Sequence, residues 1–139
     1  MRSYAYLDSS PGVVLTLVNE LLCRDEPGGA ALMTAVYAVV DTRDCTFTYA
    51  SGGHEPPLMR TADGQVEELS HYGQALGVDG GFTYTEASRS LRQGDMLVMV
   101  TDGIVEARSA NVFFGPEGVE EFLKSHRDLP PSRTPSGPQ

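Results

Sequence analysis

Short apolar segments separated by turn residues dominate the middle of the chain, and they constrain its fold more than any other feature. Each segment is rich in β-branched or aromatic residues, which is typical of strands. Two short turns lie between segments, the polar stretch 42–44 and Ala62-Asp63-Gly64, and each predicts an antiparallel hairpin. The segments are LMTAVYAVVD (32–41), CTFTYAS (45–51), PLMR (57–60), QVEEL (65–69), TYTEASRSL (83–91) and MLVMVT (96–101).

A helix is predicted on either side of these strands. Ser10-Pro11 is a helix start, because the hydroxyl can cap free N–H groups and the proline ring already has a helical φ. The helix should end near Asp25, and Gly115-Pro116 should open a second one. The first has an apolar stripe at helical spacing and the second an apolar inner face. The stripe is Val14, Leu17, Val18, Leu21 and Leu22, and the inner face is Val119, Phe122 and Leu123.

The order of helix, strands and helix predicts an α+β fold with a mainly antiparallel sheet and helices packed against it. At 139 residues the chain is long enough for one domain with a real core. We expect that domain to span residues 1–127. Residues 128–139 are rich in proline and serine and predict a disordered tail.

The charge of the chain narrows the choice of partners. A net charge of −9 argues against nucleic acid and anionic membrane as partners, because both need a basic surface.

No apolar stretch is long enough to span a bilayer, and the N-terminal residues do not resemble a signal peptide. We therefore expect a cytoplasmic protein. The two cysteines, Cys23 and Cys45, lack zinc-site spacing and favour free thiols.

Asp102 is the first candidate for chemistry, because it follows the most apolar segment of the chain and precedes Gly103. A carboxylate held at the end of a buried strand suits a hard cation such as Mg²⁺. The alternative is an Asp-Gly turn in which the carboxylate accepts local backbone hydrogen bonds. Glu106 could share a face with Asp102 if a helical turn begins there, or it could face solvent. Gly94-Asp95, between two strand segments, favours a hairpin turn.

His54 is the second candidate and lies in a Gly-Gly-His-Glu-Pro-Pro loop directly after a strand segment. Such a constrained loop could direct the imidazole into a cleft. The alternative is a structural histidine whose ring bonds to a backbone carbonyl and holds the loop.

Several segments, taken in order, resemble the stage II sporulation protein E-type phosphatases of the metal-dependent protein phosphatase (PPM) superfamily. They are PGVVLTLVNELL, TAVYAVVD, FTYASGGHEPPLM, QALGV, LRQGDMLVMVTDGIVEAR and FGPEGVEEFL. The resemblance implies a β-sandwich flanked by helices. It also implies hydrolysis of phosphoserine or phosphothreonine by water bound between two Mn²⁺ or Mg²⁺ ions.

The resemblance assigns a metal-ligand role to Asp102, with Gly103 supporting the turn, and places His54 near the site without a defined role. The implied substrate is a phosphorylated regulator of bacterial partner-switching signalling, such as an anti-anti-sigma factor.

This sequence departs from the family pattern at both ends. Members begin with acidic Gly-Asp-x-x-Asp-like and Gly-Asp-Val-x-Gly-x-Gly-like segments and close with an Asp-Asp-x-Thr-type strand, none of which is found here. We therefore expect a partial domain with an incomplete ligand set, weak or absent activity in isolation, and possible self-association through uncovered sheet. The alternative is a non-catalytic protein-binding module, or a remnant of a longer phosphatase.

Overall fold

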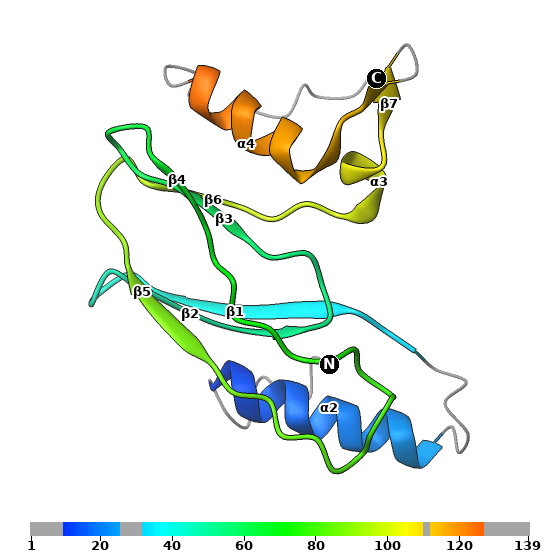
Figure 1. Ribbon diagram of the computed structural model, residues 1–139. Helices are drawn as coiled ribbons and strands as arrows, with labels where there is room; N and C mark the ends of the chain where they lie inside the picture. Colours follow the sequence, from blue (N-terminus) through cyan, green and yellow to red (C-terminus); the bar gives the residue numbers. More distant parts are fainter. Residues whose placement is uncertain (1–9, 26–31, 110–111, 127–139) are drawn as a thin grey trace, which may run out of the picture.

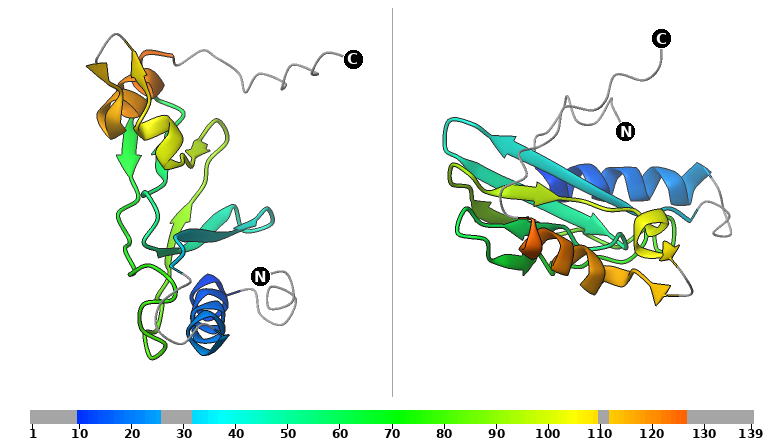
Figure 2. Two further views of the ribbon diagram at one scale, coloured as in Figure 1. Left: turned by 90° about the vertical axis from the view of Figure 1, so that its right-hand side faces the viewer. Right: turned by 90° about the horizontal axis from the view of Figure 1, so that it is seen from above.

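The computed structural model describes residues 10–25, 32–109 and 112–126, and these form four layers (Figure 1). Helix α2 (Pro11–Asp25) covers one face of a first sheet, and helix α4 (Gly115–Ser125) covers the outer face of a second (Figure 2). Sheet one contains β1 (Ala35–Asp41), β2 (Thr46–Gly52) and β5 (Ala87–Ser90). Sheet two contains β3 (Leu58–Arg60), β4 (Val66–Glu68) and β6 (Met96–Val98). The short helix α3 (Asp102–Val105) and the pair β7 (Arg108–Ser109) and β8 (Val112–Phe113) precede α4.

All pairings in the two sheets are antiparallel. The strand order is β1-β2-β5 in sheet one and β4-β3-β6 in sheet two. β1 pairs with β2 from Ala35 opposite Gly52 to Asp41 opposite Thr46, and β3 pairs with β4 around the turn at 61–65. Both predicted hairpins are therefore confirmed, as is the α+β class. β1 to β6 form the two sheets of a sandwich, and β7 and β8 pair separately.

Three apolar clusters fill the spaces between the layers. Between α2 and sheet one lie Val14, Leu15, Val18, Ala50, Leu76 and Tyr84. Between the sheets, Phe47 and Tyr49 are fully buried, and their rings stack with centroids 5.2 Å apart. Leu58 packs against Val119 and Leu123 of α4. Because β-strand side chains alternate between faces, β2 contributes Ala50 to the first cluster and Phe47 and Tyr49 to the second.

Helix α2 begins and ends where the sequence predicts, but its buried face is rotated. Leu15 and Asn19 are fully buried, whereas Leu17 and Leu21 of the expected stripe are half-buried. At the start of the helix, the Glu86 carboxylate accepts hydrogen bonds from the Gly12 N–H at 3.0 Å and the Ser10 hydroxyl at 2.7 Å. A carboxylate is favourable at this end of a helix because the free N–H groups carry partial positive charge.

Two strand predictions are wrong in extent. The segment 83–91 forms a strand only over Ala87–Ser90, because Tyr84 turns towards α2 and its N–H donates to the Thr16 hydroxyl at 3.0 Å. β6 ends at Val98, opposite Leu58, because the partner strand β3 has only three residues and follows Pro57. Proline has no N–H for a sheet hydrogen bond, so the ladder does not extend past it.

Two further predictions, one about a turn and one about a side chain, are also corrected. Gly94-Asp95 is a turn, with the Asp95 N–H bonded to the Arg92 carbonyl, but it joins β5 of sheet one to β6 of sheet two and is not a hairpin. Phe122 is 48% exposed and stacks on His126, so it does not belong to the inner face of α4. The predicted tail at 128–139 lies outside the described residues. Among the helices that are described, none is long and apolar enough to cross a membrane.

Candidate functional site

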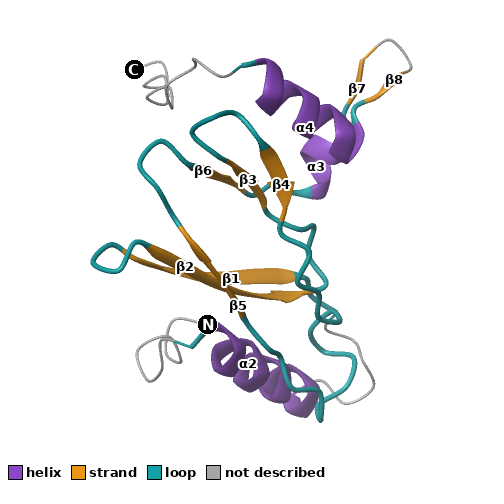
Figure 3. Ribbon diagram, turned by 60° about the vertical axis from the view of Figure 1, so that its left-hand side comes forward, coloured by secondary structure: helices purple, strands orange, loops and turns teal. Residues whose placement is uncertain are grey.

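The strand register of sheet two brings the two candidate segments to the same end of the sandwich. Leu58 at the start of β3 lies opposite both Glu68 at the end of β4 and Val98 at the end of β6. The loop before β3, which carries His54, and the segment after β6, which leads to Asp102, therefore both leave sheet two at this end. We call it the Asp102 end; the turns at 61–65 and 92–95 lie at the opposite end (Figure 3).

Asp102 is the first residue of α3 and is exposed. Three residues separate it from the end of β6, and Met99 among them is 51% exposed, so Asp102 does not directly follow a buried strand as expected. Its carbonyl accepts the Glu106 N–H at 2.7 Å, which closes a helical turn, and Glu106 itself is exposed. Within the described part of the chain, the Asp102 carboxylate forms no hydrogen bond or ion pair. The alternative in which this carboxylate accepts backbone hydrogen bonds of a local turn is therefore not seen.

Gly103 lies in the first turn of α3, and the local turn does not require a glycine. Its φ is not positive, and a Cβ built there would meet only the Thr101 hydroxyl, at 3.9 Å. The close approach of a ligand at Gly103 remains a prediction.

His54 is half-buried, and its Nδ1 lies 2.9 Å from the carbonyl oxygen of Glu55. A carbonyl can only accept, so Nδ1 donates this hydrogen bond. The ring thus makes the backbone contact of the structural alternative, and this contact does not involve Nε2.

The Gly53-His54 loop is held by a second loop, residues 73–79. Gly53 has φ +71°, and its N–H donates to the Gly73 carbonyl at 2.8 Å. A Cβ on Gly53 would lie 2.8 Å from the backbone of Ala75. This position therefore requires glycine both for its backbone conformation and for the close approach of the two loops.

Asn19 and Tyr84 hold the second loop through hydrogen bonds to its backbone, and the sequence predicted neither role. The buried Asn19 amide donates to the Asp79 carbonyl at 2.7 Å and accepts the Gly77 N–H at 2.8 Å. The Tyr84 hydroxyl donates to the Gln74 carbonyl at 2.9 Å, and burial raises the pKa of this phenol above its ordinary value. The available signal was Asn19 itself, a polar residue four positions after Leu15 and next to Val18 on an apolar helix.

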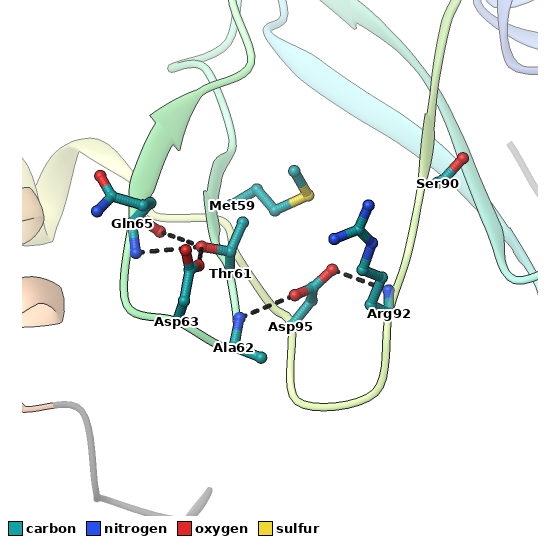
Figure 4. A pocket seen from close by; sticks show the side chains of 8 residues that line it. All are labelled: Met59, Thr61, Ala62, Asp63, Gln65, Ser90, Arg92 and Asp95. Atoms are coloured by element: carbon teal, nitrogen blue, oxygen red, sulfur yellow. Dashed lines mark hydrogen bonds between the residues drawn. The ribbon is translucent and has the colours of Figure 1, made fainter.

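Among the cavities lined by described residues, two flank sheet two. One, of about 330 Å³, lies at the Asp102 end beside His54, with Glu68 of β4 and Pro116 of α4 in its walls. The other, of about 520 Å³, lies at the opposite end between the turns (Figure 4). There, both oxygens of Asp95 accept backbone N–H groups, from Ala62 at 2.9 Å and Arg92 at 2.8 Å. Asp95 therefore joins the two turns, a contact that the sequence did not predict.

The described residues do not by themselves form a metal site. No group of three or more His, Cys, Asp or Glu side chains among them is arranged to hold an ion. A lone carboxylate supplies at most two of the roughly six oxygens that Mg²⁺ requires. Asp102 therefore does not fit a dinuclear centre without further ligands.

Comparisons with known proteins give consistent matches. The family model of stage II sporulation protein E (SpoIIE) matches residues 1–136. Phosphoserine phosphatase RsbU of Bacillus subtilis is 29% identical over 117 residues, which are 84% of this chain and 35% of RsbU. The chain thus spans about a third of the length of this relative.

Solved structures show the same fold. The SiaA-PP2C domain of Pseudomonas aeruginosa matches with a TM-score of 0.71 at 20% identity, over 84% of this chain and 46% of that one. The SpoIIE phosphatase domain from Bacillus subtilis, presoaked with Mn, matches with a TM-score of 0.55 at 21% identity, over 81% and 48%. The two sheets and flanking helices are therefore those of a PP2C-like domain, of which this chain forms a part.

Proposed function

Because the chain belongs to the stage II sporulation protein E (SpoIIE) family, whose model matches nearly its whole length, we propose that it is part of a phosphatase domain acting on phosphoserine or phosphothreonine. The proposed substrate is a phosphorylated partner-switching regulator, such as an anti-anti-sigma factor. The observation that carries the proposal is that the segment leading to Asp102 and the Gly53-His54 loop leave sheet two at the same end. These are the two motifs on which the family resemblance is most specific.

In this proposal Asp102 is one ligand of a Mn²⁺ or Mg²⁺ centre. Divalent ions at such a centre offset phosphate charge and lower the pKa of an attacking water. Asp102 suits a ligand role because its carboxylate is exposed and makes no competing bond to the described residues. The remaining ligands would come from outside the described residues, so we expect weak or absent hydrolysis by this chain alone.

The test measures ion binding and hydrolysis separately. In the 139-residue chain, Mn²⁺ should raise the thermal midpoint slightly, and Asp102→Asn should abolish that rise. Glu106→Gln is the matched control, since it removes a carboxylate from the same exposed turn. A rise that survives Asp102→Asn refutes the ligand assignment. Rapid Mn²⁺-dependent hydrolysis of p-nitrophenyl phosphate that is lost in Asp102→Asn would contradict the expected weak activity.

A second candidate is a non-catalytic module that binds a regulator. It is supported by the lack of a three-ligand group among the described residues. Calorimetry separates the two candidates: a module binds its protein partner without Mn²⁺, and its stability does not depend on the ion.

Two further properties belong to the proposal. β1 has a strand neighbour on one side only in the described sheet, and its Val40 is 53% exposed. An unpaired apolar edge favours association, so we expect concentration-dependent self-association in size-exclusion chromatography. Cytoplasmic localisation stays a prediction.

A further inference from the structure

The cavity at the Asp102 end is lined by three separate parts of the chain. The loop before β3 contributes His54, Glu55 and Pro56; the end of β4 and the chain after it contribute Glu68 and Tyr72. The first turn of α4 contributes Pro116. Because α4 packs on sheet two through Val119 and Leu123, the cavity lies between well-packed elements and not within one loop.

The charges in this cavity have one sign. Glu55 and Glu68 bring two carboxylates, and no lysine or arginine lines the cavity. Neither carboxylate forms an ion pair with any described residue, unlike Glu67, which pairs with Arg89 at 3.6 Å. The Glu68 carboxylate accepts the Tyr72 hydroxyl at 2.8 Å, and the pKa of Tyr72 is raised chiefly by this bond and further by the charge of Glu55.

The other walls favour a flat cationic group. Tyr72 is 63% exposed, so most of its ring is open to a ligand. The ring of Pro56 provides apolar wall, and the His54 ring is held beside it by its contact with the Glu55 carbonyl. An aromatic ring beside carboxylates suits a guanidinium, which stacks on aromatic faces and donates to several acceptors at once. A lysine ammonium is compact and strongly hydrated, and it would use fewer of these contacts.

We propose that this cavity binds an arginine side chain presented by a protein partner, with Glu55 and Glu68 as the charge partners and Tyr72 as the stacking surface. The cavity lies at the same end of sheet two as Asp102. An arginine bound there would orient a protein partner at the end of sheet two where Asp102, the proposed metal ligand, lies. The binding itself requires neither hydrolysis nor a metal ion, so this inference and the proposed function can fail independently.

The test uses the blocked peptide acetyl-Gly-Arg-Gly-amide, titrated into the full chain in low salt without metal and followed by NMR shifts. We expect saturable shifts at the Gly53 amide and the Tyr72 ring. The matching citrulline peptide, which has the same shape without the charge, should bind at least about tenfold more weakly. Glu68→Gln should weaken arginine binding about three- to tenfold, and Tyr72→Ala about threefold or more.

Two controls separate this site from general attraction to an acidic protein. Glu67→Gln removes the same charge from the neighbouring position of β4, where Glu67 pairs with Arg89, and should change the affinity less than about twofold. Tyr72→Phe keeps the ring and should also bind within about twofold. The proposal is overturned if Glu67→Gln weakens binding as much as Glu68→Gln, or if citrulline binds as well as arginine. It also fails if agmatine binds and the peptide does not, since the cavity would then accept only small guanidines.

Discussion

Replacing Gly53 by alanine tests whether the loop that carries His54 is held as closely as the structure indicates. The residue has φ +71°, and a Cβ would lie 2.8 Å from both the Cα and the N of Ala75. The left-handed conformation costs a residue with a Cβ about 1–2 kcal/mol. Overpacking against neighbouring backbone adds about 1–3 kcal/mol. The sum predicts a destabilisation of roughly 2–5 kcal/mol, which is a large part of the stability of a small domain.

The measurement is urea unfolding of the full chain, followed by far-UV circular dichroism. Gly103→Ala is the control, because its φ is not positive and its Cβ would meet nothing closer than 3.9 Å. There, alanine should leave stability unchanged or raise it by up to about 1 kcal/mol, as expected for a helical glycine. If Gly53→Ala costs less than about 0.5 kcal/mol, or no more than Gly103→Ala, then the two loops are not packed as described.

Two further substitutions test the supports of the site, and a third tests the turns at the opposite end of sheet two. Asn19→Ala leaves the Gly77 N–H and the Asp79 carbonyl without their partner and should cost about 2–5 kcal/mol in urea unfolding; an unchanged midpoint would contradict the buried contacts. Burial raises the pKa of Tyr84 above its ordinary value of 10.0, so only the unfolded state ionises as the pH first passes 10.0 and stability falls there. Tyr84→Phe should make this fall shallower between pH 9 and 11, and an equal slope would refute the assignment. Asp95→Ala frees the Ala62 and Arg92 N–H groups and should lower stability by about 1–3 kcal/mol, while arginine-peptide binding at the opposite end stays unchanged.

Local patterns predicted most elements correctly because each depends on neighbouring residues. Ser10-Pro11 and Gly115-Pro116 mark helix starts, and α2 and α4 begin at Pro11 and Gly115. The turns at 42–44 and 62–64 each join two antiparallel strands. The wrong strand predictions depend on distant residues: β5 begins only at Ala87 because Tyr84 turns towards α2, and β6 ends at Val98, opposite the first residue of β3. Phe122 has the right spacing for the inner face of α4, but whether sheet two reaches it is a property of packing.

The sequence by itself determined the residue types at the candidate site and the family to which the motifs point. Only the tertiary structure decided which motifs share an end of the fold: the register of β3 against β4 and β6 brings the His54 loop, Glu68 and the segment leading to Asp102 to one end of sheet two. It also showed that the backbone and packing at Gly53 admit no side chain, whereas those at Gly103 do. The physical reason is that a cavity and a close contact between loops arise from segments far apart in the chain. The spacing of residues within one segment does not predict them.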